Sequence, residues 1–141
     1  MMNQLCVLDV SYGVAFGNSI SQYAAVVCGA NDGFAALPAG QNAAGFLGIT
    51  QNQVTQSSQA NCQTSVSVRK LGVAWAVSNG AINYGDHLII ASAVGDVMSV
   101  EATIQAGTNG LLNVIGKAES SATASGQPVF VWLDPQVIPA A

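Results

Sequence analysis

The single histidine of this 141-residue chain, His87, follows Asp86 and lies five positions before Ser92. Serine, histidine and aspartate are the residue types of a nucleophilic triad, which is defined by geometry and not by closeness in sequence. Adjacent residues of a strand point to opposite faces of a sheet, so Asp86 is not placed to orient His87. The pattern favours a turn aspartate followed by a strand histidine.

The other acidic residues stand singly at predicted turns or on exposed strand faces. They lack the fixed spacing of a general acid and base, and no D-x-D-x-D-G run indicates a calcium loop. Lys117 with Ser120 or Ser121 could suggest a Ser/Lys dyad, but a solvated strand end explains these residues more simply. We therefore expect no enzyme activity and no catalytic residue.

Residues 110–118 read G-x-x-x-x-x-G-K-A, which superficially resembles a phosphate-binding loop. The true motif has four residues between its glycines and a Ser or Thr after the lysine, because that hydroxyl binds magnesium. The three cysteines, Cys6, Cys28 and Cys62, fit neither a closed disulfide set nor a zinc site, and we interpret them as buried thiols. We expect no cofactor and no metal.

The composition excludes several classes of partner. Charged residues make up 7% of the chain, and three basic residues stand against seven acidic ones. So few basic groups cannot follow a phosphate backbone, which excludes nucleic acid as a partner. No apolar run reaches the ~20 residues of a membrane-spanning helix, and the N-terminus lacks a secretory pattern. We expect no membrane association, synthesis in the cytoplasm, and a charge-poor surface packed against neighbouring subunits.

Alternating apolar residues predict strands along most of the chain. From Cys6 to Phe16 every even-numbered residue is apolar, the period of two that a strand with one buried face shows. Further strands are predicted over residues 23–28, 45–50, 66–77, 87–91, 97–104, 111–118 and 129–133. Residues 35–44 are predicted as an Ala/Gly/Pro-rich loop and residues 51–63 as a polar loop.

The strand over residues 66–77 changes parity in its middle. A bulge or bend at Arg69–Lys70 would return both apolar sets to one core. Beyond it, small residues at positions 72, 74 and 76 permit close approach of another sheet or subunit. Trp75 and Trp132 lie within apolar strands, and we predict that both anchor the core, with a subunit interface as the alternative.

Together these patterns predict an all-β fold, a single-domain small β-barrel or β-sandwich with a polar loop and an N-terminal strand or arm. We divide the chain into an N-terminal strand or arm (1–22), a core (23–135) and a C-terminal tail (136–141). Two segments resemble one another: GFLGITQN (45–52) and NVIGKAES (113–120) each precede a polar spacer and an alternating strand. Duplication of a half-barrel would produce this echo, as would chance similarity.

The C-terminal half is similar to the small phage capsid decoration (cement) proteins. Its residues LGVAWAVSNGAINYGDHLIIASAVGDVMSV and then NVIGKAESSATASGQPVFVWL share with that family several strand and turn features. These are a Gly-Val-Ala strand, a Gly-Asp turn, a hairpin turn with Gly, an Ile-Gly-x-Ala strand and a Gly-x-x-Val-x-Val strand. The upstream segment GFLGITQN (45–52) resembles an earlier strand of the same family, so the resemblance spans residues 24–134, and the segment before Tyr23 has no counterpart.

The resemblance implies a structural protein of the virion that binds the outer capsid surface of a bacteriophage and stabilises contacts between major capsid protein subunits. It also implies a homo-oligomer, with a trimer favoured over a dimer. The rival interpretation is a sugar- or receptor-binding β module of a phage tail or fibre. An aromatic platform beside exposed Asn, Asp and Gln would favour this rival, whereas Trp75 and Trp132 within apolar strands favour the decoration protein. We predict interface residues on the N-terminal strand and the small-residue face: Leu8, Val10, Tyr12, Val14, Phe16, Gly72, Ala74 and Ala76.

Overall fold

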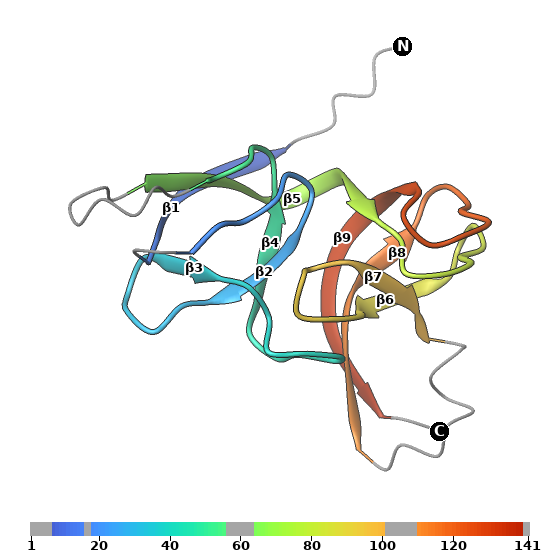
Figure 1. Ribbon diagram of the computed structural model, residues 1–141. Helices are drawn as coiled ribbons and strands as arrows, with labels where there is room; N and C mark the ends of the chain where they lie inside the picture. Colours follow the sequence, from blue (N-terminus) through green and yellow to red (C-terminus); the bar gives the residue numbers. More distant parts are fainter. Residues whose placement is uncertain (1–6, 16–17, 56–63, 101–109, 140–141) are drawn as a thin grey trace.

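The computed structural model describes residues 7–15, 18–55, 64–100 and 110–139. The strands over these residues confirm the all-β prediction (Figure 1). They are β1 (Leu8–Val14), β2 (Ala25–Cys28), β3 (Phe34–Ala36), β4 (Phe46–Thr50), β5 (Thr64–Val77), β6 (His87–Ile90), β7 (Val97–Ser99), β8 (Leu111–Ala118) and β9 (Pro128–Pro139).

Strands β1 to β5 form a closed five-stranded barrel, the first ring. Their order is β1-β3-β2-β4-β5, and β1 closes the ring by pairing with β5. Every pairing is antiparallel except that of β1 with β3, where Val14 is the partner of Ala35. Closure gives each of these strands two neighbours, which removes the exposed edges of an open sheet.

Strands β5 to β9 form a second ring with the order β5-β9-β8-β6-β7, antiparallel throughout. An isolated parallel bridge between Ser78, just after β5, and Val97 of β7 brings the two ends of this order together. The Asn79 N–H donates a hydrogen bond of 2.7 Å to the carbonyl of Val97 at the same place.

Strand β5 belongs to both rings, since residues 64–71 pair with β1 and residues 72–77 pair with β9. Asp9 is the partner of Arg69 while Leu8 is the partner of Leu71, so Lys70 is the extra residue of a bulge. Gly72 follows with a φ of 98°, which glycine reaches without strain. The irregularity predicted at Arg69–Lys70 is confirmed, and it passes the strand from one ring to the other.

The two rings repeat one topology. The β2–β3 hairpin corresponds to β6–β7, β4 corresponds to β8, and β5 is the last strand of the first ring and the first strand of the second. The isolated bridge between Ile20 and Val54 in the first ring has its equivalent in the bridge between Ile82 and Ala122 in the second. The two segments of the sequence echo contain β4 and most of β8, which are equivalent strands. The unit that repeats in the structure is therefore a whole ring and not a half-barrel.

The interior of the first ring is lined by buried apolar side chains of β1, β2 and β5, including Val14, Val26, Val66 and Val68. The largest core cluster lies in the second ring and also includes Ala25 and Ile49 of the first ring. The β6–β7 turn joins the rings directly, because the Ala25 N–H donates to the Gly95 carbonyl at 2.8 Å. The two rings therefore pack directly against each other and form one domain.

Three boundaries differ from those predicted. Residues 8–14 form a ring strand that is paired within the chain, so the segment 1–22 contains part of the barrel. β9 runs to Pro139, paired with Leu111, so most of the predicted tail belongs to a strand. The predicted loop 35–44 contains part of β3, which is too short to show a period of two. The predicted strand end over 101–104 lies outside the described residues.

Candidate functional site

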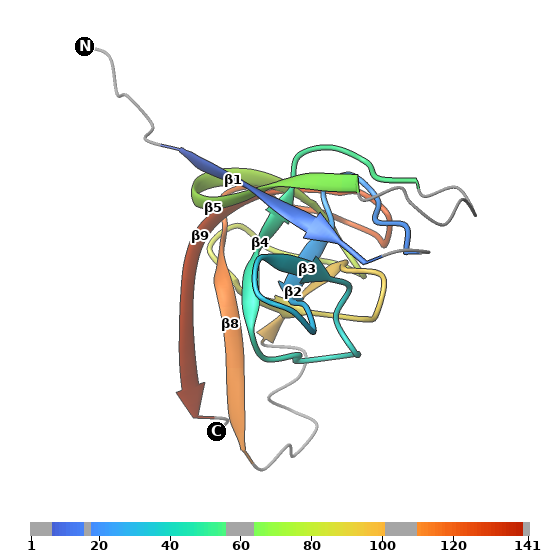
Figure 2. The ribbon, with the colours of Figure 1, turned by 90° about the vertical axis from the view of Figure 1, so that its left-hand side faces the viewer.

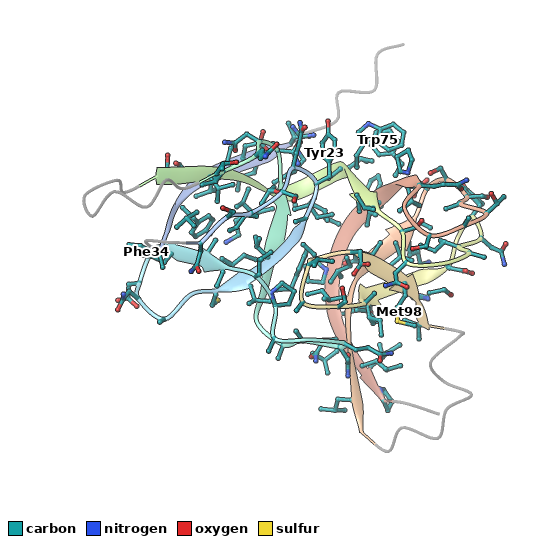
Figure 3. All side chains as sticks on the ribbon, in the orientation of Figure 1. Tyr23, Phe34, Trp75 and Met98 are labelled. Atoms are coloured by element: carbon teal, nitrogen blue, oxygen red, sulfur yellow. The ribbon has the colours of Figure 1, made fainter. Side chains whose placement is uncertain are left out.

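The outer surface of the second ring carries an aromatic face, which we define as Trp75, Phe130 and Trp132. Trp75 of β5 pairs with Phe130 of β9, and Val73 pairs with Trp132. The alternate residues of both strands, among them Ala74 and Val131, are buried at 1% and 0% exposure. Since alternate side chains take opposite faces of a sheet, the aromatic residues point outward. Figure 3 shows Trp75 at the surface, beyond Tyr23.

The rings of Trp75 and Phe130 lie parallel, with an interplanar angle of 2° and centroids 4.3 Å apart. Phe130 therefore covers one face of the Trp75 indole, which remains 40% exposed, and Trp132 is 48% exposed. The prediction that both tryptophans anchor the core is wrong. The small residues Ala74 and Ala76 fill the inward positions instead, because the space beneath them is occupied by larger side chains such as Leu88 and Ile115.

Two charged residues border the aromatic face on the β8 side. Lys117 is the partner of Trp132, and the Glu119 N–H donates to the Phe130 carbonyl at 2.7 Å. Both side chains are exposed, and neither forms an ion pair with another described residue. The face thus places partly exposed aromatic rings next to one cationic donor and one anionic acceptor.

The equivalent surface of the first ring is polar. Ser11 pairs with Ser67 where Trp75 pairs with Phe130, and Asp9 pairs with Arg69 where Val73 pairs with Trp132. The equivalence extends to single hydrogen bonds. In the first ring, the Ser67 carbonyl accepts a hydrogen bond from the Gln51 N–H, and the Ser67 N–H donates to the Asn52 side chain. In the second ring, the Phe130 carbonyl accepts from the Glu119 N–H, and the Phe130 N–H donates to the Ser120 side chain.

An ion pair between Asp9 and Arg69 lies on this polar surface, next to the Ser11–Ser67 pair. The guanidinium donates to both carboxylate oxygens, from Nε at 2.8 Å and from Nη2 at 3.1 Å. These hydrogen bonds lower the pKa of Asp9, against a smaller opposing effect of burial, and raise the pKa of Arg69. Arg69 also donates to the Val73 carbonyl at 3.2 Å, which ties the ion pair to the second half of β5.

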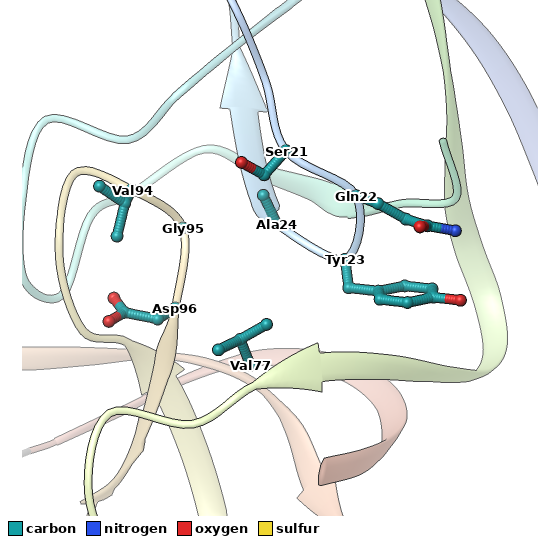
Figure 4. Close-up of a pocket in the computed structure, with 8 residues that line it drawn as sticks. All are labelled: Ser21, Gln22, Tyr23, Ala24, Val77, Val94, Gly95 and Asp96. Carbon is teal, nitrogen blue, oxygen red and sulfur yellow. The ribbon is translucent and has the colours of Figure 1, made fainter. Parts of the chain in front are cut away.

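A small cavity of about 180 Å³ lies between the rings (Figure 4). Tyr23 and Val77 form one side of it, and the β6–β7 turn at Val94–Asp96 forms the other. The Asp96 carboxylate already accepts hydrogen bonds from Asn79 at 2.8 Å and Ser92 at 2.6 Å. These two hydrogen bonds hold the Asp96 carboxylate in place at the wall of the cavity.

A two-stranded ribbon projects from the second ring where β8 and β9 extend past their neighbours (Figure 2). Asn113 pairs with Val137 and Leu111 with Pro139. Leu111 and Val137 are 62% and 59% exposed. The Asn42 side chain fixes the ribbon to the body, because its Oδ1 accepts from the Asn113 N–H at 2.8 Å and its Nδ2 donates to the Leu111 carbonyl at 2.9 Å.

The predicted interface residues do not form one surface. Leu8 is 51% exposed, whereas Val14, Ala74 and Ala76 are buried at 1% or less, which removes these three from any surface of the chain. Gly72 lies at the bend of β5. Val10 and Tyr12 are half-buried, with Tyr12 accepting a hydrogen bond from Lys70 Nζ at 2.7 Å. Phe16 lies outside the described residues.

The residues considered for chemistry are also separated. The Asp86 carboxylate accepts a hydrogen bond from the Asn83 N–H at 3.0 Å within a turn, and His87 begins β6 as the partner of Lys117. Cys28 is an exposed thiol, not a buried one as predicted, while Cys6 and Cys62 lie outside the described residues. Across the described ranges no three His, Cys, Asp or Glu residues cluster as metal ligands, and no helix there is long and apolar enough to cross a membrane.

No family model and no curated protein matches the chain. Among solved structures it is similar to the N base of head fiber gp8.5 in bacteriophage phi29, with a TM-score of 0.60. The match covers 92% of this chain and 95% of that chain, with 16% sequence identity. At this identity the likeness shows a shared fold across almost the whole of both chains.

Proposed function

We propose that this protein is a structural component of a bacteriophage head. On this proposal it decorates the outer surface of the shell, stabilises contacts between major capsid subunits and catalyses no reaction. The observation that carries the proposal is the likeness in fold to the N base of a phage head fiber over 92% of the chain. The resemblance of residues 24–134 to capsid decoration proteins supports the same location.

The charge of the chain supports an outer position over an inner one. Its net charge of −4, with only three basic residues, is unfavourable beside packaged DNA. We propose that the β8–β9 ribbon contacts the shell through Leu111 and Val137, because exposed apolar residues at the tip of a projection suit burial in a partner. We also propose that copies associate on the shell, as trimers, so that several weak contacts act together.

Copy counting tests the location. Virions of the encoding phage are purified on a density gradient, separated into heads and tails, and the protein is quantified by mass spectrometry. We expect the protein in the head fraction, in a number set by the symmetry of the shell, and earlier release of DNA on heating from virions that lack it. Recovery only with tails would support the rival interpretation of a tail or fibre module and would overturn the proposal.

A double variant and a control variant test the contact between the β8–β9 ribbon and the shell. The double substitution Leu111→Ser with Val137→Ser should lower the number of copies on the head, because it removes apolar area from the ribbon tip. Tyr84→Ser, at a 70% exposed aromatic residue outside the ribbon, is the matched control and should leave the number unchanged. Sedimentation of the purified protein tests self-association, and a monomer both free and on the shell would contradict the trimer.

A further inference from the structure

The aromatic face is not required by the fold. The first ring builds the same strand pairs with Ser11, Ser67 and Arg69 at the positions of Trp75, Phe130 and Trp132. Both rings nevertheless keep the same register and the same flanking hydrogen bonds. Large aromatic rings on a solvent-facing surface where serine serves equally well indicate a ligand that contacts them.

We propose that the aromatic face is a carbohydrate-binding site that takes a chain of pyranose sugars. A pyranose ring has a face of C–H groups, which packs against the electron-rich face of an indole, while its hydroxyls point outward from the ring edge. The uncovered side of the Trp75 indole provides such a surface, and Phe130 holds that indole in one orientation.

The borders of the face suit the hydroxyl groups of a sugar. A hydroxyl both donates and accepts hydrogen bonds, so it pairs with an ammonium group and with a carboxylate. Lys117 and Glu119 provide these two groups beside Trp132 and Phe130 respectively. Apolar surface with a few polar groups at its margin is the usual composition of a small-ligand site.

The dimensions favour a sugar chain over a protein. Trp75 and Trp132 are diagonal neighbours across the β5–β9 pair, a separation of roughly 7–8 Å between backbones. Less than half of each side chain is exposed, so together they offer on the order of 200 Å². Each partner of a stable protein complex contributes about 800 Å². The face is therefore large enough for two or three sugar units and too small for a protein interface of its own.

Intrinsic fluorescence provides a direct test, because Trp75 and Trp132 are the only tryptophans of the chain. The purified full-length protein is titrated to about 10 mM with β-1,4-linked trisaccharides of glucose and of N-acetylglucosamine, and with a galactose trisaccharide. We expect saturable quenching or a blue shift with at least one of the three, at a Kd on the order of 1 mM or below. No change with any of them would overturn the proposal.

The equivalent residue pair of the first ring indicates which substitutions remove the aromatic face without disturbing the fold. Trp75→Ser with Phe130→Ser copies the Ser11–Ser67 pair, so the fold is expected to survive, as circular dichroism and a thermal melt will show. Trp132 remains as the fluorescent reporter. Binding should weaken at least about tenfold, as the loss of an aromatic stacking partner does. Undiminished binding by a folded double variant would contradict the site.

Two further variants complete the design. Tyr84→Ser removes an exposed aromatic residue that is not part of the face, and it should leave the affinity unchanged. Glu119→Gln keeps the shape of the side chain but removes its charge, and it should weaken binding by several-fold. If the native protein instead self-associates in sedimentation and the double variant does not, the face is a subunit interface and the proposal is wrong. The outcome of the sugar titrations does not depend on whether the protein is found on phage heads.

Discussion

Gly48 and Gly116 occupy equivalent positions in the two rings, and at each a carbonyl of the next strand leaves no room for a side chain. A Cβ at Gly48 would overlap the carbonyl of Arg69, and one at Gly116 would overlap the carbonyl of Trp132. The two obstructing residues are themselves equivalent, since Ile49 pairs with Arg69 as Lys117 pairs with Trp132. The second ring thus reproduces a close backbone approach of the first as well as its strand order.

Substitution of Gly116 by alanine should therefore destabilise the protein by about 3 kcal/mol or more, because the neighbouring strand must move to admit a methyl group. The measurement is urea unfolding followed by circular dichroism. Gly40→Ala is the matched control, since a Cβ there meets no atom within 4 Å, and it should change stability by less than about 0.5 kcal/mol. Equal midpoints for the two variants would refute the close approach.

The Asp9–Arg69 ion pair should make stability depend on pH in the acid range. Because the pKa of Asp9 is lowered in the folded state, its stabilisation is complete above the ordinary carboxyl pKa of about 3.9 and is lost as the pH falls through the lowered value. Asp9→Asn should cost less than about 1 kcal/mol at neutral pH, since the pair is partly exposed. The difference from the native protein should shrink below about pH 4. A difference that stays constant down to pH 2.5, roughly a unit and a half lower, would contradict this origin.

Removal of residues 1–14 should abolish cooperative folding of the first ring. β1 closes that ring by pairing with β5 and β3, and its loss would expose Val66 and Val68, both fully buried. The truncated chain should bind a hydrophobic dye and lose its sharp thermal transition. A chain that begins at Val7 keeps all of β1 and is the control. If residues 15–141 melt like the full chain, β1 contributes nothing to the core.

Asn42→Ala should loosen the β8–β9 ribbon without unfolding the rings. The substitution removes the two side-chain hydrogen bonds to Leu111 and Asn113, and it places alanine at a φ of 59°. Hydrogen exchange at the Asn113 amide should accelerate by at least about tenfold, equivalent to ~1.4 kcal/mol of local protection. The amides of Val129 and Val131, in the buried part of β9, serve as internal controls. Unchanged exchange at Asn113 would show that the β8–β9 pairing alone holds the ribbon.

The regular alternation of apolar residues identified the strands, including the full extent of β8 and the irregularity at Arg69–Lys70. It failed for β3, because three residues within an Ala/Gly/Pro-rich segment show no period. The alternation also predicted that the last strand ends at Leu133, before Asp134–Pro135, whereas β9 continues to Pro139. There the strand continues as a two-stranded ribbon with Leu111–Val114, and a ribbon tolerates proline on its open side.

The aromatic face was missed because both parities of β5 are apolar after Lys70. Size alone suggested that Trp75 belongs inside and Ala74 outside, whereas the limited space within the second ring requires the reverse. The short echo of residues 45–52 and 113–120 does not include these positions, and only the strand pairs of the structure bring them into correspondence. When the two rings are aligned by their strand pairs, Trp75 corresponds to Ser11 and Phe130 to Ser67, and polar residues at those positions mark the solvent side.

The bend at Gly72 joins the two rings without a linker. Repeated units in a chain are usually joined by an exposed segment that proteases cut and about which the units swing. Here the junction lies inside a hydrogen-bonded strand, between Leu71, which pairs with Leu8 of the first ring, and Gly72, which pairs with Leu133 of the second. A protease has no extended, unpaired backbone to bind there, and a hinge would have to break ladder hydrogen bonds of β5. A pulling force applied to one ring would be transmitted to the other through the continuous, hydrogen-bonded strand β5.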